Sequence, residues 1–311
     1  MSLPLHVAPI TESTQNPGPY SRLFRRRSGK AAPPLVALQG GCTAHENTMA
    51  VIGGWWAEIW QYRELLWFLA LRDIKVRYKQ TVLGAGWAVI QPLLGMVVFT
   101  TFFGKVIGTA NVDVPYPIFT YCALVPWTYF SSTLSQAGNS LVTNSNLITK
   151  VYFPRVLLPA ANVLSGQLDF LIGSGFLVVL MAHYGVYPNW GLIFYPILMI
   201  ATGVFTLGAG MWLAALNVRY RDVKYTIPFL VQLGLFTTPV IYPKTLMSRR
   251  IQQLMSLNPL AGIIEGFRAC LFPEHQIDFK LIESSAAVGG VLFVIGALYF
   301  RSTEKAFSDI V

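Results

Sequence analysis

Long apolar runs with few charged residues recur along the 311-residue chain. A helix needs about 20 such residues to cross the hydrocarbon core of a bilayer, because it rises about 1.5 Å per residue. Six candidate runs are present, at residues 83–104, 117–137, 157–181, 192–216, 225–242 and 283–300. The sequence therefore predicts an all-α integral membrane protein with six transmembrane helices.

The segment before the first run has the pattern of an amphipathic helix at the membrane surface. Between residues 55 and 80, aromatic and aliphatic side chains share one sector of a helical projection, whereas Arg72, Lys75 and Lys79 lie on the opposite face. Rings at headgroup depth and cations near phosphate are typical of a helix lying in the interface. The central part, residues 65–71, is apolar all round, so part of this helix is also expected to pack under other helices.

The segment at residues 246–272 is apolar but interrupted. Asn258–Pro259 breaks it, and Glu265 with Arg268 lies in its most apolar part. Irregular backbone at membrane depth is tolerated where protein or water surrounds it. Two short re-entrant helices before the last span are therefore predicted.

The domain organisation follows from these segments. Residues 1–54 are rich in Pro, Ser, Thr and Gly and show no sustained periodicity, which predicts a mobile cytoplasmic tail. This tail is either simply solvated or touches anionic lipid through its run of arginines at residues 25–27. The interface helix spans residues 55–80, the six-helix membrane region spans 81–305, and residues 306–311 form a cytoplasmic C-terminus.

The positive charge of the chain has two possible meanings, a nucleic-acid surface or a topology signal. The chain has 23 Lys and Arg against 14 Asp and Glu. With the N-terminus inside, 17 of the 23 cations fall on the cytoplasmic side and 6 on the other. Cationic residues concentrate on the cytoplasmic side of membrane proteins, so both termini are predicted to be cytoplasmic and no nucleic-acid partner is expected.

Motifs of common enzyme classes are missing from the sequence. It has no GxxxxGK[ST] stretch to cradle a nucleotide phosphate, no HExxH and no GxSxG. Its three Cys and four His are scattered, so no metal site is expected. The chain is therefore predicted not to be an enzyme.

Three ionisable residues within the apolar segments are candidates for function. Asp169 lies deep in a predicted span and is either an ion or proton site or a structural hydrogen-bonding group beside Ser165 and Gln167. Glu265 and Arg268 are three residues apart, so they either pair on one helix face or form a gate facing a transport path.

Aromatic residues concentrate in the first, second and fifth predicted spans. A row of rings suits weak, repeated stacking on sugar faces, and the alternative is that these rings face lipid or pack between helices. The candidate channel-lining residues are Trp87, Phe99, Phe103, Tyr121, Phe236 and Tyr242.

Three stretches resemble permease subunits of ABC-type polysaccharide exporters, the class that moves O-antigen, capsule and teichoic-acid polymers. Residues 65–93 read LLWFLALRDIKVRYKQTVLGAGWAVIQPL, residues 216–243 read LNVRYRDVKYTIPFLVQLGLFTTPVIYP, and residues 257–268 read LNPLAGIIEGFR. The resemblance covers roughly residues 56–305. The first 50 residues depart from it, being longer than the usual cytoplasmic start.

The resemblance implies a homodimeric permease in a bacterial inner membrane, working with two separate ATPase subunits. ATP and magnesium would bind those partners, and this chain would carry no cofactor. The implied cargo is a polysaccharide on a polyprenyl-pyrophosphate lipid, taken from the cytoplasmic leaflet through a channel between two permease copies. Membrane lipids would be the remaining partners.

Two groups of residues fit that mechanism. Fixed cations near the end of the interface helix are suited to bind a pyrophosphate headgroup, with ordinary positive-inside anchoring as the alternative. These cations are Arg72, Lys75, Arg77 and Lys79. The loop at residues 139–155 suits a short coupling helix that contacts an ATPase, with a simple connector as the alternative. Its predicted contact residues are Asn144, Leu147, Ile148 and Phe153.

Other functions stay open on the sequence alone. An ABC exporter of a drug or glycolipid would share the same architecture. An ion-coupled secondary carrier would use Asp169, and a polyprenyl-phosphate glycosyltransferase would need acidic clusters in loops, of which none stands out. An ABC importer is disfavoured because no EAA-like loop is found.

Overall fold

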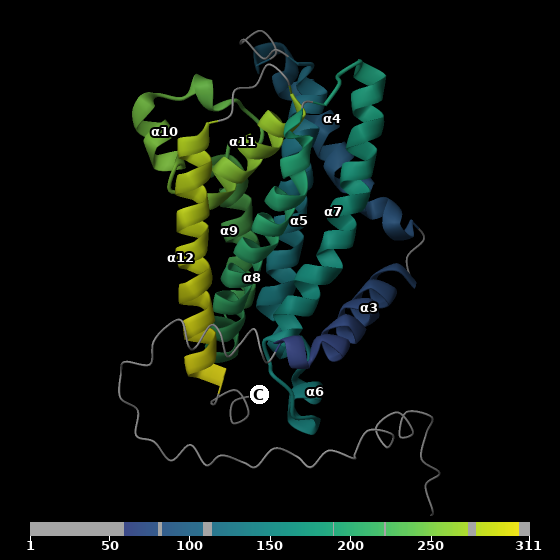
Figure 1. Ribbon diagram of the computed structural model, residues 1–311, viewed down its shortest axis with the longest axis vertical. Helices are drawn as coiled ribbons and strands as arrows, with labels where there is room; N and C mark the ends of the chain where they lie inside the picture. Colours follow the sequence, from purple (N-terminus) through teal and green to yellow (C-terminus); the bar gives the residue numbers. More distant parts are fainter. Residues whose placement is uncertain are drawn as a thin grey trace, which may run out of the picture. The chain divides into compact units, whose positions relative to one another are not determined.

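The computed structural model describes residues 59–79, 83–107, 114–188, 190–220, 222–272 and 278–304 (Figure 1). In these ranges the regular secondary structure is entirely helical, which confirms the predicted all-α class. The chain divides into two units, Met1–Glu46 and Asn47–Val311, and every element below belongs to the second. The tail predicted at residues 1–54 and the C-terminus predicted at 306–311 lie outside the described residues.

Four helical segments are long and apolar enough to cross a membrane. They are Gly84–Lys105, which covers most of α4 (Trp87–Ile107), α7 (Leu157–Tyr184), Trp190–Arg219, which includes α8 (Tyr195–Arg219), and α12 (Phe279–Glu304). They coincide with four of the six predicted spans. Three short 3-10 turns, η1 (Gly84–Gly86), η2 (Trp190–Phe194) and η3 (Lys244–Leu246), adjoin the longer helices or connect them.

The other two predicted spans fall in helices that do not meet the criteria of length and hydropathy for crossing a membrane, for different reasons. α5 (Tyr116–Thr143) is 28 residues long, but serines, threonines and amides fill its second half. α9 (Val223–Thr237) has only 15 residues and ends where Thr238 becomes extended. Pro239 follows, and a residue before proline disfavours helical backbone. Length and hydropathy therefore support four spans among the described residues, rather than the predicted six.

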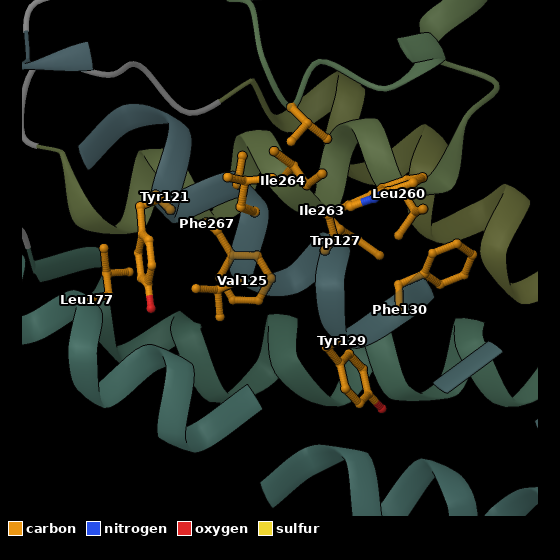
Figure 2. Close-up of a cluster of buried hydrophobic side chains, with 14 of the residues drawn as sticks. Tyr121, Val125, Trp127, Tyr129, Phe130, Leu177, Leu260, Ile263, Ile264 and Phe267 are labelled. Carbon is orange, nitrogen blue, oxygen red and sulfur yellow. The ribbon is translucent and has the colours of Figure 1, made fainter. Parts of the chain in front are cut away.

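α5 is the helix around which the others pack. It contacts α4, α7, α8, α9 and α11 (Pro259–Leu271) (Figure 1). A cluster of buried apolar side chains joins it to α11, and Figure 2 shows members of both helices together. These are Tyr121, Val125, Trp127, Tyr129 and Phe130 of α5 and Leu260, Ile263, Ile264 and Phe267 of α11. The core of the described unit therefore lies along the first half of α5.

A second buried cluster fixes α3 (Arg63–Lys79) against α7. Leu69 and Ala70 are almost fully buried, whereas Trp60 and Trp67 are 70% and 61% exposed. α6 (Ser145–Lys150), which follows α5, contributes Ile148 to the same cluster. The apolar middle of α3 thus packs on protein, as predicted, while Trp67 of α3 and Trp60, which precedes this helix, stay on the outer surface.

α8 and α12 approach each other closely because both have glycine at the crossing. A Cβ added at Gly296 would lie 2.2 Å from the carbonyl oxygen of Gly208, and one added at Gly208 would lie 2.5 Å from Phe293 Cα. Small residues allow such backbone contact between membrane helices. These two glycines therefore set the spacing of the pair.

The segment at residues 246–272 forms two short helices, as predicted. α10 (Arg249–Met255) and α11 are separated at Asn258, whose side-chain oxygen accepts from the Leu260 N–H at 3.0 Å. Pro259 occupies the first turn, where its missing N–H costs nothing. Every residue of α11 is buried, but its 13 residues are too few to cross a bilayer.

Candidate functional site

The last turn of α3 carries a charged cluster that joins three helices. The Arg77 guanidinium donates to the Asp169 carboxylate of α7 and to the side-chain oxygen of Gln136 on α5. The Tyr78 hydroxyl donates to the other oxygen of Asp169, and Ser165 Oγ lies 3.5 Å from Arg77. The sequence could not bring these residues together, because Arg77 and Asp169 are 92 positions apart.

The environment keeps this cluster intact at neutral pH. Burial, followed by the hydrogen bond to Asp169, raises the pKa of Tyr78 above its ordinary value of 10, so its hydroxyl stays protonated and remains a donor. The Arg77 and Asp169 side chains are 24% and 21% exposed. Removing one partner of such a half-enclosed pair leaves a charge poorly solvated, which costs more than the pair itself contributes. Asp169 therefore has the structural hydrogen-bonding role that was one of its two predicted readings.

Two cavities meet at this cluster. The first, here called the tryptophan cavity, has about 250 Å³ and lies between the start of α4, α5 and α7, with Trp87, Gln91, Ser132 and Asp169 in its wall. The second, the asparagine cavity, has about 800 Å³ and lies between α3, α5 and α7, with Arg72, Asn139, Asn144 and Asn162 in its wall. Arg77 and Gln136 line both. Together the two cavities are called the polar groove.

The four cations predicted to hold a headgroup do not form one cluster. Lys75 and Lys79 are exposed and, with Arg72, line an open pocket of about 390 Å³ on α3, here called the cation pocket. Arg72 donates to Asp73 at 2.8 Å and to Asn144 of α5 at 3.1 Å. Arg77 is absent from this pocket and is held by Asp169. Three of the four predicted residues are thus brought together.

The predicted channel aromatics occupy different environments. Trp87, Phe103 and Phe236 are 50%, 42% and 57% exposed. The rings of Phe99 and Phe103 are 6.3 Å apart, and the Tyr242 hydroxyl donates to the Phe236 carbonyl at 2.7 Å. Tyr121 differs, because it is fully buried and its hydroxyl lies 3.3 Å from the Gly173 carbonyl. Tyr121 thus belongs to the core and has no ring face at the surface of the described unit.

The three apolar residues predicted to contact an ATPase are turned inward. Ile148 and Phe153 are 8% and 6% exposed, and Leu147 packs against the same cluster. Asn144 ends α5, where it accepts from Arg72 and donates to the Ser140 carbonyl at 2.9 Å. These residues anchor the loop to the rest of the chain.

The exposed surface of that loop is formed by residues that sequence reasoning missed. Tyr152 is 96% exposed and Val151 is 51% exposed, directly before the buried Phe153. The alternation of an aromatic outside and an aromatic inside in residues 151–154, VYFP, is the signal that could have identified them. An exposed tyrosine beside an apolar residue is typical of a protein-contact surface.

Glu265 and Arg268 pair on one face of α11, as their spacing predicted, at a distance of 2.9 Å. Arg268 is completely buried and also donates to the backbone carbonyls of Pro239 and Val240 at 2.7 and 2.8 Å. Its guanidinium lies 3.7 Å from the ring centroid of Phe119 on α5, a cation–π contact. In this arrangement the pair ties α11 to α5 and to the chain that follows α9.

Comparison with known proteins places these features in a wider group. The family model described as ABC-2 type transporter matches residues 64–272. The O-antigen export system permease protein RfbA of Myxococcus xanthus is 32% identical over 255 residues, which cover 81% of this chain and 97% of that protein. An RfbA permease of Klebsiella pneumoniae is 30% identical over 252 residues, covering 79% of this chain and 95% of that protein.

A more distant relative carries a different polymer in its name. The polysialic acid transport protein KpsM of Escherichia coli is 21% identical over 243 residues. That alignment covers 76% of this chain and 93% of KpsM. The cation pocket, the polar groove, the 139–155 loop and α11 all lie within the residues that the family model matches.

Proposed function

Since this chain belongs to the ABC-2 type transporter family, we propose that it is the transmembrane subunit of an ATP-driven polysaccharide exporter. Its cargo is a polysaccharide attached to a polyprenyl-pyrophosphate lipid in the cytoplasmic leaflet of a bacterial inner membrane. Two copies of the chain form the channel that the polymer follows. The observation that carries this proposal is the similarity to O-antigen export permeases over almost their whole length.

In this proposal six segments cross the membrane. α5 crosses despite its polar second half, because that half faces protein and the polar groove rather than lipid. α9 crosses together with residues 238–242, which form turns and bends, and α10 with α11 enters from the outer side and returns. The excess of cations on one side favours cytoplasmic termini.

ATP hydrolysis takes place on separate partner subunits that bind ATP and magnesium. This chain has no phosphate-cradling GxxxxGK[ST] motif of its own. The exposed Tyr152 and Val151, held by the buried Ile148 and Phe153, form the contact for the partner. Movement of the partner would reach α5 and α7 through this anchored loop.

The cation pocket holds the pyrophosphate of the cargo lipid. Arg72, Lys75 and Lys79 supply positive charge on α3. Trp67 of this helix and Trp60 just before it are exposed, as rings at headgroup depth are. Charge-assisted hydrogen bonds from several donors suit a pyrophosphate. The exposed aromatics Trp87, Phe103 and Phe236 are available to a polymer sliding between two copies.

Export in cells tests this function directly. Deletion of the gene should remove the polysaccharide from the cell surface and accumulate lipid-linked polymer inside, and a plasmid copy should restore export. An ABC exporter of a drug would instead leave surface polysaccharide unchanged and alter drug sensitivity. Surface polymer at the normal level in the deletion strain would refute the proposal.

A further inference from the structure

The polar groove is lined from α5 by a stripe of hydroxyl and amide side chains. Ser132, Ser135, Gln136, Asn139 and Thr143 follow a helical spacing and share one face. Ser132, Ser135 and Asn139 donate to backbone carbonyls of α5, and Gln136 accepts from Arg77. The same side chains line the two cavities, where their remaining donor and acceptor positions can bond to water or to a polar ligand. The groove therefore offers a hydrogen-bonding surface inside a membrane protein.

The wall of the groove combines groups that recognise a saccharide. Hydroxyls and amides both donate and accept, which suits sugar hydroxyls that do both. Trp87 adds an aromatic face, half exposed, at the mouth of the tryptophan cavity. Gln91, one turn further along α4, is exposed, and its side chain makes no hydrogen bond to any described residue.

The groove also adjoins the cation pocket. Arg72 lines both the cation pocket and the asparagine cavity, and Arg77 and Gln136 line both the asparagine cavity and the tryptophan cavity. If Arg72, Lys75 and Lys79 bind a phosphate, the group attached to that phosphate would therefore lie beside the groove. Cations at one end and hydroxyl-binding groups along the rest match a sugar phosphate ester.

We propose that the polar groove is a binding site for the saccharide unit attached directly to the pyrophosphate of the cargo lipid. This inference rests on the proposed function and adds to it a site that reads the first sugar. Trp87 stacks on the sugar, Gln91 and Gln136 bond to its hydroxyls, and the Arg77–Asp169 pair forms the wall between the two cavities.

The test measures binding of two defined probes to the full-length chain in lipid nanodiscs. One probe is a short-chain prenyl pyrophosphate that carries one N-acetylhexosamine, and the other is the same prenyl pyrophosphate without sugar. The sugar-bearing probe should bind about tenfold more tightly, the factor that about 1.4 kcal/mol supplies. In the Trp87→Leu/Gln91→Leu double variant this ratio should fall close to one, while binding of the sugarless probe stays at the wild-type level.

Matched controls come from exposed residues outside the groove. Trp212→Leu on α8 and Gln253→Leu on α10 should keep the wild-type ratio, and Trp87→Phe, which retains a ring, should keep most of it. A ratio near one in the wild type, or a full ratio in the double variant, would overturn the groove site. Neither result would contradict the proposed function, because export to the cell surface is measured independently in the deletion strain.

Discussion

Arg77 and Asp169 form an ion pair between α3 and α7, although 92 positions separate them in the sequence. The same carboxylate accepts from Tyr78, and the same guanidinium donates to Gln136 of α5. One cluster therefore fixes the end of α3 to α5 and α7.

Single substitutions of the pair should destabilise the chain, and the double variant should lose less than the sum. We expect a coupling energy of about 0.5–3 kcal/mol between Arg77→Ala and Asp169→Ala in a double-mutant cycle. Reversible unfolding by SDS in mixed micelles gives the four free energies. The more exposed pair of Lys244 and Asp278, at 2.7 Å, is the comparison and should give about 0.2–1 kcal/mol. A coupling of zero for Arg77 and Asp169 would show that the contact is dispensable.

Lys75 and Lys79 should matter for transport but not for folding, because both side chains are exposed. Hydrogen bonds to charged groups are worth about 1.5–3 kcal/mol, so the Lys75→Gln/Lys79→Gln variant should reduce export about tenfold or more. Surface polysaccharide and membrane-inserted protein are measured in the same cells. Arg63→Gln, at the start of the same helix, is the matched control. Normal export by the lysine variant would contradict the proposed role of the cation pocket in binding the cargo lipid.

Tyr152→Ala should weaken association with the ATPase partner. An aromatic anchor in a protein interface commonly contributes about 2 kcal/mol or more, so recovery of the ATPase with the tagged chain should fall sharply. Tyr187→Ala is the control, since Tyr187 is 80% exposed but lies at the opposite end of α7 from the loop. Equal recovery of the partner with both variants would exclude this surface.

Glu265→Gln should strongly destabilise the fold, because it leaves Arg268 buried without a charged partner. The expected loss is about 3–5 kcal/mol, the range for breaking one side of a buried ion pair. Fluorescence-detected size-exclusion chromatography after heating reports the loss as a lower melting temperature. Arg249→Met, on the exposed face of α10, should leave that temperature unchanged. A stable Glu265→Gln protein would show that the buried Arg268 does not need its charged partner.

Gly296→Ala should separate α8 from α12. The added methyl would lie 2.2 Å from the Gly208 carbonyl oxygen, and overpacking of this kind costs about 1–3 kcal/mol. Gly290→Ala on the same helix has no atom within 4 Å of its Cβ and is the matched control. Thermal unfolding of the two variants in the same detergent gives the comparison, and equal melting temperatures would contradict the close approach.

Local patterns in the sequence predict the features that depend on neighbouring residues. Hydropathy identifies α4, α7, α8 and α12, and the spacing of Glu265 and Arg268 predicts their pair. Asn258 before a proline predicts the break between α10 and α11. Each of these rests on contacts within a few residues.

Features that depend on tertiary packing could not be predicted in the same way. The partner of Arg77 lies on another helix, so a list of cations on α3 could not separate it from Lys75 and Lys79. Burial of Phe153 and exposure of Tyr152 depend on which face of the loop meets α3 and α7. Likewise, the polar second half of α5 lowered its hydropathy, and only the cavities beside it explain that composition.

The carbonyls of Pro239 and Val240 are satisfied by a side chain that is synthesised later. Arg268 follows Pro239 by 29 residues and Val240 by 28. Until the ribosome has made Arg268, the two carbonyls that follow α9 lack the donor that they have in the folded protein. The backbone that follows α9 therefore reaches its final hydrogen bonding only after α11 has been made and has packed against it.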